Sequence, residues 1–162
     1  MRCGGYRPLS QFLAILLIAL GATQAQADDG KEKIHVVYHV NSESARHQMA
    51  ALRSVRNHLE AEGDGIEIRV VLQGRGVSML VLPDALLHLN GLHQANATPQ
   101  MTALVAELSQ RGVRFEVCAN SLQRHAIDPD HDLYTADNIV IVPNGVAELA
   151  RLQQQGYLYI KP

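Results

Sequence analysis

Long basic runs are absent from this sequence, and several familiar catalytic motifs are absent as well. The 162 residues hold 14 Lys and Arg against 16 Asp and Glu, which gives a formal net charge of −2. A chain without a basic stripe has little attraction for phosphate backbones, so we expect no nucleic-acid partner. The sequence also contains no nucleophile elbow and no paired-carboxylate arrangement, so the enzyme classes that depend on those motifs receive no support.

Apolar runs of membrane-spanning length are missing too. The run at residues 12–22 has 11 residues, whereas about 20 are needed to span a bilayer. Arginines precede this run and the small residues Ala25 and Ala27 follow it, which is the pattern of a cleavable secretory signal peptide. We predict a signal peptide at 1–27, a linker at 28–33, and a periplasmic or secreted protein with no membrane span after cleavage. A retained membrane anchor is the alternative interpretation.

Cysteine is scarce, since only Cys3 and Cys118 are present. The predicted cleavage removes Cys3, so the mature chain has no internal disulfide. A lone cysteine in an oxidising compartment is either buried and inert or retained for its reactivity, and both interpretations stay open here. A structural zinc site is not expected with one cysteine, and we predict no resident metal or other cofactor.

Strand-like and helical segments alternate along the rest of the chain. β-Branched and apolar runs predict five strands, at 34–40, 66–72, 113–118, 139–142 and 157–160. Apolar residues at steps of three and four predict helices between them, at 45–59, 101–108, 121–125 and 146–152. This alternation predicts one α/β domain at 34–162, a flavodoxin-like, doubly wound, mostly parallel sheet with helices on both faces.

The apolar segment 78–89 is harder to assign. We expect a short helix interrupted by Pro83. Because the stretch 78–92 carries more apolar residues than a surface loop should, we also expect it to be an interface between subunits.

Ligands of such sheets bind at the carboxyl ends of the strands, and four loops leave those ends with polar or flexible residues. The candidate pocket residues in these loops are Asn41, Gly74, Arg75, Gly76, Asn120, Ser121 and Asn144. Gly74 and Gly76 allow the backbone to approach an anion, with Arg75 as the counter-charge. A tight turn is the other interpretation, because Met79 breaks the full glycine-rich dinucleotide pattern.

Cys118 is the candidate nucleophile. It closes a predicted strand and stands directly before a short helix, whose N-terminal N–H groups lower the pKa of a thiol and favour the thiolate. That position suits a persulfide carrier or an attacking thiol. The competing interpretation is a small residue packed in the core at the end of a strand.

Eight histidines remain after the predicted cleavage, but their spacing does not form a zinc motif. His35 and His39 lie four apart on one strand and therefore share a face. The other histidines lie on predicted helices or in polar loops, and we expect those in the loops to be solvated rather than bound to metal.

Two C-terminal segments resemble a known family. Residues 112–122 (GVRFEVCANSL) are similar to the strand–cysteine–helix segment of the DsrE/DsrF-like (YchN-like) proteins, and 142–162 is similar to the ending of an exported branch of that family. The resemblance covers roughly 34–162. It implies a flavodoxin-like sheet, a homo-oligomer (trimer or hexamer), and a cysteine at the position of Cys118 that accepts and passes on sulfane sulfur as a persulfide.

The sequence therefore leaves two functions open. The first is a periplasmic sulfur-handling protein, in which Cys118 accepts sulfur, Asn120 and Ser121 donate hydrogen bonds to it, and a sulfur donor or acceptor protein is the partner. The alternative is a non-catalytic oligomeric module that binds a small ligand or a partner, with Cys118 as a structural residue.

Overall fold

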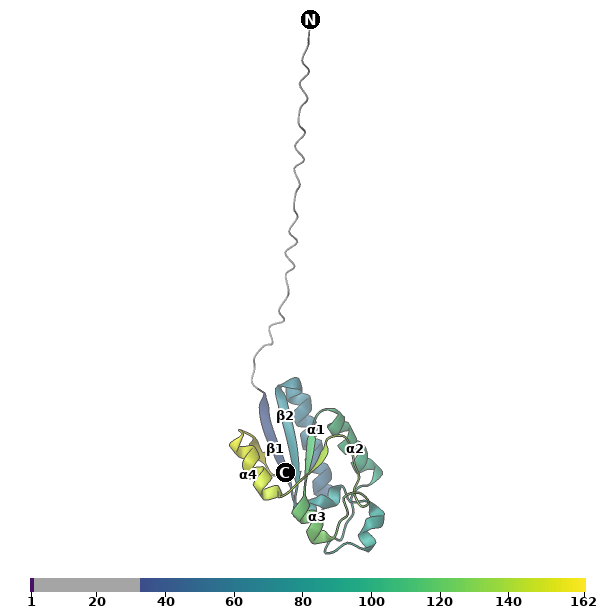
Figure 1. Cartoon of the computed structure of the whole chain (residues 1–162). Helices are drawn as coiled ribbons and strands as arrows, with labels where there is room; N and C mark the ends of the chain where they lie inside the picture. Colours follow the sequence, from purple (N-terminus) through teal and green to yellow (C-terminus); the bar gives the residue numbers. More distant parts are fainter. Residues whose placement is uncertain (2–32) are drawn as a thin grey trace. The chain divides into compact units, whose positions relative to one another are not determined.

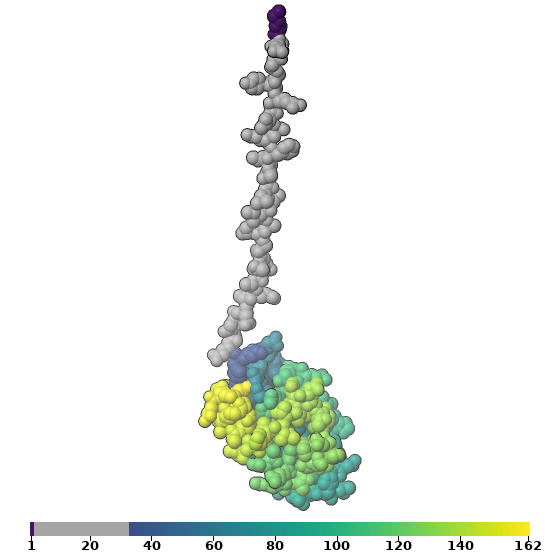
Figure 2. All heavy atoms as spheres, in the orientation of Figure 1, coloured from purple at the N-terminus to yellow at the C-terminus, as the bar shows by residue number. Residues whose placement is uncertain are grey.

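The computed structural model describes Met1 and residues 33–162. Residues 33–162 form a five-stranded parallel sheet with helices (Figure 1), and Figure 2 shows the heavy atoms of the chain as spheres in the same orientation. The strands are β1 (Ile34–Val40), β2 (Ile66–Leu72), β3 (Arg114–Cys118), β4 (Ile139–Val142) and β5 (Leu158–Ile160). Their order in the sheet is β4-β3-β2-β1-β5, and every neighbouring pair is parallel. The predicted α/β fold is confirmed. The predicted signal peptide, Met1 apart, lies outside the described residues, and so does the linker up to residue 32.

Helices cover both faces of this sheet. Helices α1 (Ala45–Glu62) and α2 (Pro99–Gln110) pack on one face, together with a large apolar cluster that includes Leu52 and Leu108. Helix α4 (Gly145–Gln154) covers the other face, where Leu149 and Leu152 pack on Val37 and Val71 (Figure 1). None of the helices in the described part is both long and apolar enough to cross a bilayer.

The helix boundaries follow local capping chemistry. The side chain of Ser44 accepts a hydrogen bond from the His47 N–H at the start of α1, and Gly63, with φ of 55°, ends that helix. The side chain of Asn144 accepts from the N–H groups of Val146 and Ala147 at the start of α4. The caps at Ser44 and Asn144 place the starts of α1 and α4 just beyond the carboxyl ends of β1 and β4, next to the loops that carry the candidate residues.

The segment 78–92 differs from the expected interrupted helix. It contains the end of one 3₁₀ helix, η2 (Gly74–Met79), and all of a second, η3 (Pro83–Leu87), rather than one interrupted helix. Met79, Leu80 and Val81 are fully buried in the core, and Leu87 is the strongly exposed apolar side chain of the segment. Most of its apolar residues complete the hydrophobic core, and a subunit interface on this stretch stays a prediction.

The chain leaves β3 and β4 toward opposite faces. Helix α3 (Ala119–His125) follows β3, and its Leu122 packs in the cluster on the α1/α2 face, whereas β4 leads to α4 on the other face. Ligand sites of open α/β sheets form where successive connections diverge in this way. The carboxyl ends of β3 and β4, which carry Cys118 and Gly145, therefore form the natural place for a site.

Gly76 offers a test of how tightly the loop after β2 packs against β1. A Cβ added at Gly76 would lie 2.1 Å from the carbonyl oxygen of Val40, which is too close for any side chain. We expect Gly76→Ala to lower the free energy of unfolding by about 2–3 kcal/mol, measured by urea denaturation. Gly65→Ala is the matched control, because an added Cβ there meets no atom within 4 Å. Equal stability of the two variants would contradict this packing.

Candidate functional site

Cys118 lies at the carboxyl end of β3, and its side chain is enclosed by polar groups rather than by apolar ones alone. The residue is 2% exposed. Its Sγ accepts a hydrogen bond from the backbone N–H of Gly145, at the start of α4, with N and Sγ 3.2 Å apart. The site thus joins the end of β3 to the first turn of α4.

Ser121 connects Cys118 to the loop after β2. The Ser121 hydroxyl lies close to the Cys118 thiol and lowers its pKa. The same oxygen accepts from the N–H of Gly74, at 2.8 Å. Gly74 has φ of 55°, a left-handed conformation that glycine adopts without strain. The Gly74 backbone therefore holds the Ser121 hydroxyl in place beside the thiol.

The polar groups around the sulfur decide the protonation state of the thiol. Burial raises the pKa of the Cys118 thiol, but the nearby Ser121 hydroxyl, the Gly145 N–H that donates to the sulfur, and the dipoles of the Ser121 and Asn120 N–H groups lower it. The polar groups prevail, so the pKa of Cys118 lies below that of an ordinary thiol. A thiolate is the nucleophilic form of cysteine, and this site favours it.

Gly145 permits the close approach of α4 to the cysteine. A Cβ added there would lie 3.2 Å from Cys118 Cβ and 3.1 Å from Gln73 Cγ. Any larger residue would push α4 away and lengthen the hydrogen bond to the sulfur. Gln73, Gly145 and Cys118 consequently form one packed group.

A histidine on β1 fixes the position of Gln73. His39 Nε2 donates to Gln73 Oε1 at 2.9 Å, and its Nδ1 accepts from the Tyr159 hydroxyl at 2.8 Å. Burial is the main cause that lowers the pKa of His39; the Gln73 hydrogen bond opposes it and the charge of Lys161 adds to it. A neutral imidazole ring donates one hydrogen bond and accepts one, which matches these two contacts. This His39–Gln73–Tyr159 group was not among the predicted site residues, because the pairing of β5 with β1 cannot be seen in the sequence.

The predicted pocket residues fall into two groups. Asn120 and Ser121 lie at the thiol and lower its pKa, and the Gly74 N–H donates to the Ser121 hydroxyl, one contact further away. The others act elsewhere: Asn41 is exposed, Arg75 lies 3.7 Å from Glu43, Gly76 packs on Val40, and the Asn144 side chain caps α4.

Metal ligands do not gather in the part of the chain that the structure describes. No group of three or more His, Cys, Asp or Glu side chains there is placed to hold an ion. The loop histidines instead pair with carboxylates: His88 Nε2 lies 3.1 Å from Asp132, and His131 Nδ1 lies 3.0 Å from Asp128.

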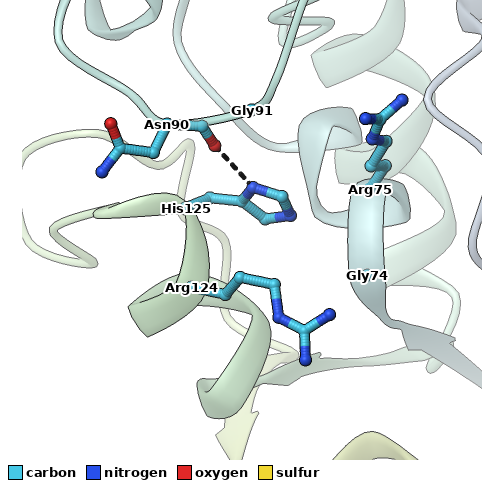
Figure 3. Close-up of a pocket in the computed structure, with 6 residues that line it drawn as sticks. All are labelled: Gly74, Arg75, Asn90, Gly91, Arg124 and His125. Carbon is cyan, nitrogen blue, oxygen red and sulfur yellow. Dashed lines mark hydrogen bonds between the residues drawn. The ribbon is translucent and has the colours of Figure 1, made fainter.

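An open cavity of about 340 Å³ lies next to the thiol site (Figure 3). Its lining residues are Gly74, Arg75, Asn90, Gly91, Arg124 and His125. Gly74 therefore belongs both to the cavity wall and, through Ser121, to the surroundings of Cys118.

We expect the Cys118 thiol to ionise below the pH at which it ionises in the unfolded chain. Between the two pKa values unfolding takes up a proton, so the stability of the wild type should rise with pH there, relative to Cys118→Ala. Thiolate absorbance measured against pH gives the folded pKa. Ser121→Ala removes the hydroxyl beside the thiol and should raise that pKa. The same thiol pKa in the wild type and in Ser121→Ala would contradict this role of the Ser121 hydroxyl.

Known proteins were then compared with this chain. A model of the DsrE/DsrF-like family matches residues 31–162. A protein of unknown function from Methanobacterium thermoautotrophicum has a similar solved structure, with 28% identity and a TM-score of 0.62, and the match covers 80% of this chain and 100% of that one. The YchN protein of E. coli matches with 14% identity and a TM-score of 0.57, over 81% of this chain and 99% of that one.

The search of curated proteins gave no significant match. The family match spans the whole described sheet with its helices, and it includes Cys118 and the polar groups around its sulfur. The chain belongs to the DsrE/DsrF-like family.

Proposed function

We propose that this protein carries sulfur as a persulfide on Cys118. Membership of the DsrE/DsrF-like family supports a sulfur-relay type of function. The observations that carry the proposal to this residue are the hydrogen bond from the Gly145 N–H to Sγ and the lowered pKa of a thiol whose residue is only 2% exposed. A cysteine that served only as packing would need neither.

The transfer conserves atoms and electrons. The Cys118 thiolate attacks the outer sulfur of a persulfide, R–S–SH, forms a new S–S bond and releases R–S⁻ as the old S–S bond breaks. Cys118 then holds a persulfide. Delivery is the same reaction with a thiolate of the acceptor as the attacking group, so neither step needs an external oxidant or reductant.

Burial of the thiol constrains the donor. Because Cys118 is only 2% exposed, a small sulfur donor such as a polysulfide reaches its thiolate more easily than the active-site loop of a donor protein does. Once formed, the persulfide extends the side chain by one atom, which brings its outer sulfur nearer to the surface. A protein partner is therefore better suited to receive the sulfur than to supply it.

We further propose that the protein works in the periplasm or outside the cell. The support is the pattern of residues 1–27, with two arginines, an apolar run of 11 residues and the sequence Ala25-Gln26-Ala27. Export places Cys118 where thiols are readily oxidised. Enclosure of its sulfur within the fold would protect it from unselective oxidation.

Persulfide formation is tested with the purified, reduced protein and polysulfide. Intact-mass spectrometry should show the addition of one sulfur atom to the wild type and no addition to Cys118→Ser. Ser121→Ala should be modified more slowly at neutral pH, because less of its thiol is ionised. Identical spectra for the wild type and Cys118→Ser would leave Cys118 as a structural residue and the protein as a binding module.

We also propose a homo-oligomer, a trimer or a hexamer. Its support is the exposure of apolar side chains on both edge strands and at the start of α4. Ile141 on β4 is 49% exposed, Leu158 on β5 is 61% exposed, and Val146 on α4 is 59% exposed. An edge strand that also exposes apolar residues favours association with another chain.

Size-exclusion chromatography with light scattering should give a multiple of the subunit mass. Ile141→Glu places a charge on the exposed edge of β4 and should reduce the mass toward that of one chain. A monomeric wild type at micromolar concentration would contradict the proposal.

A further inference from the structure

The cavity beside the thiol site has a cationic lining. Two arginines and a histidine, Arg75, Arg124 and His125, contribute to its wall, and the remaining lining residues are Gly74, Asn90 and Gly91. No carboxylate is among the residues that line it. A hollow bounded by positive charge on one side and by low-dielectric protein on the other concentrates anions.

The groups come from two separate segments that face each other. Arg124 and His125 belong to the last turn of α3, and Gly74 and Arg75 begin η2 (Figure 3). His125 is 6% exposed, and its Nδ1–H donates to the Asn90 carbonyl oxygen at 2.7 Å. This bond orients the ring and turns Nε2 toward the space between Arg75 and Arg124 (Figure 3).

The two arginines are available for a ligand in different degrees. The Arg75 side chain is 55% exposed, and its guanidinium lies 3.7 Å from the Glu43 carboxylate. An ion pair this exposed contributes little to stability. Arg124 forms no ion pair with any residue that the structure describes. A planar guanidinium donates two parallel N–H groups, a geometry that matches two oxygens of a tetrahedral oxyanion.

We propose that this cavity is a binding site for a small, doubly charged oxyanion of the sulfate, thiosulfate or phosphate type. Arg124 supplies the principal charge, Arg75 turns to it from Glu43, and His125 contacts it through Nε2. Cys118 is not among the lining residues, so anion binding does not need the thiol. The site is thus additional to the proposed sulfur carrier and stands if that function fails.

Isothermal titration of the purified protein with thiosulfate, sulfate and phosphate, in a chloride buffer of constant ionic strength, tests the site. One saturable site is expected. Arg124→Gln should weaken binding about tenfold or more, which corresponds to the loss of a hydrogen bond to a charged group. Arg111→Gln is the matched control: Arg111 is also exposed and its loss changes the charge equally, but it precedes β3 at the amino end of the sheet.

The outcomes separate the ligand and the two proposals. Tighter binding of thiosulfate and sulfate identifies a sulfur oxyanion, and tighter binding of phosphate identifies a phosphoryl group. Cys118→Ser should retain full binding, even if it forms no persulfide. Absence of saturation with all three anions would overturn the proposal, and so would equal weakening by Arg124→Gln and Arg111→Gln, because binding would then follow overall charge alone.

Discussion

The polar contacts of Cys118 Sγ are the interaction on which the site depends. The Gly145 N–H at the start of α4 donates to the sulfur, and Ser121 of α3, which the Gly74 N–H of the loop after β2 holds in place, lies beside it. Each of these groups belongs to the end of an element rather than to a flexible tip. The sulfur is therefore surrounded by groups whose positions the sheet itself determines.

The fold provides this convergence through its topology. In the order β4-β3-β2-β1-β5, the connection after β3 goes to one face and the connection after β4 goes to the other. The two ends diverge around Cys118, which leaves room for the first turn of α4 to approach it. Gly145 is needed because Gln73 and Cys118 already fill the space where a side chain would lie. His39 and Tyr159, on strands β1 and β5, then hold Gln73 in that position.

Much of this architecture could be predicted from the sequence, because local patterns determine the elements. β-Branched runs gave the strands, and spacing of three and four gave α1, α2 and α4. The position of Cys118 between a strand and a short helix was likewise a local signal. The two 3₁₀ helices around residues 78–87 were not predicted, since apolar composition does not distinguish a segment that crosses the core in short turns from a regular helix.

Long-range pairing explains the residues that were missed. His39 meets Tyr159 because β5 returns to lie beside β1, a contact across 120 positions that periodicity does not encode. Glu116 is a similar case. It stands in the middle of β3 and is 1% exposed, which is unexpected for a carboxylate, and the Arg69 guanidinium of β2 pairs with it at 2.9 Å. Each half of such a pair is uninformative until the register of the strands is known.

The central claim is that the fold makes Cys118 a reactive thiolate instead of an inert core residue. The most direct measurement is the rate of reaction of Cys118 with a small alkylating reagent as a function of pH, in the native protein and in the chain unfolded by urea. We expect the native thiol to react, and its rate to rise at lower pH than in the unfolded chain. A native thiol that is protected at every pH and reacts only on unfolding would contradict it.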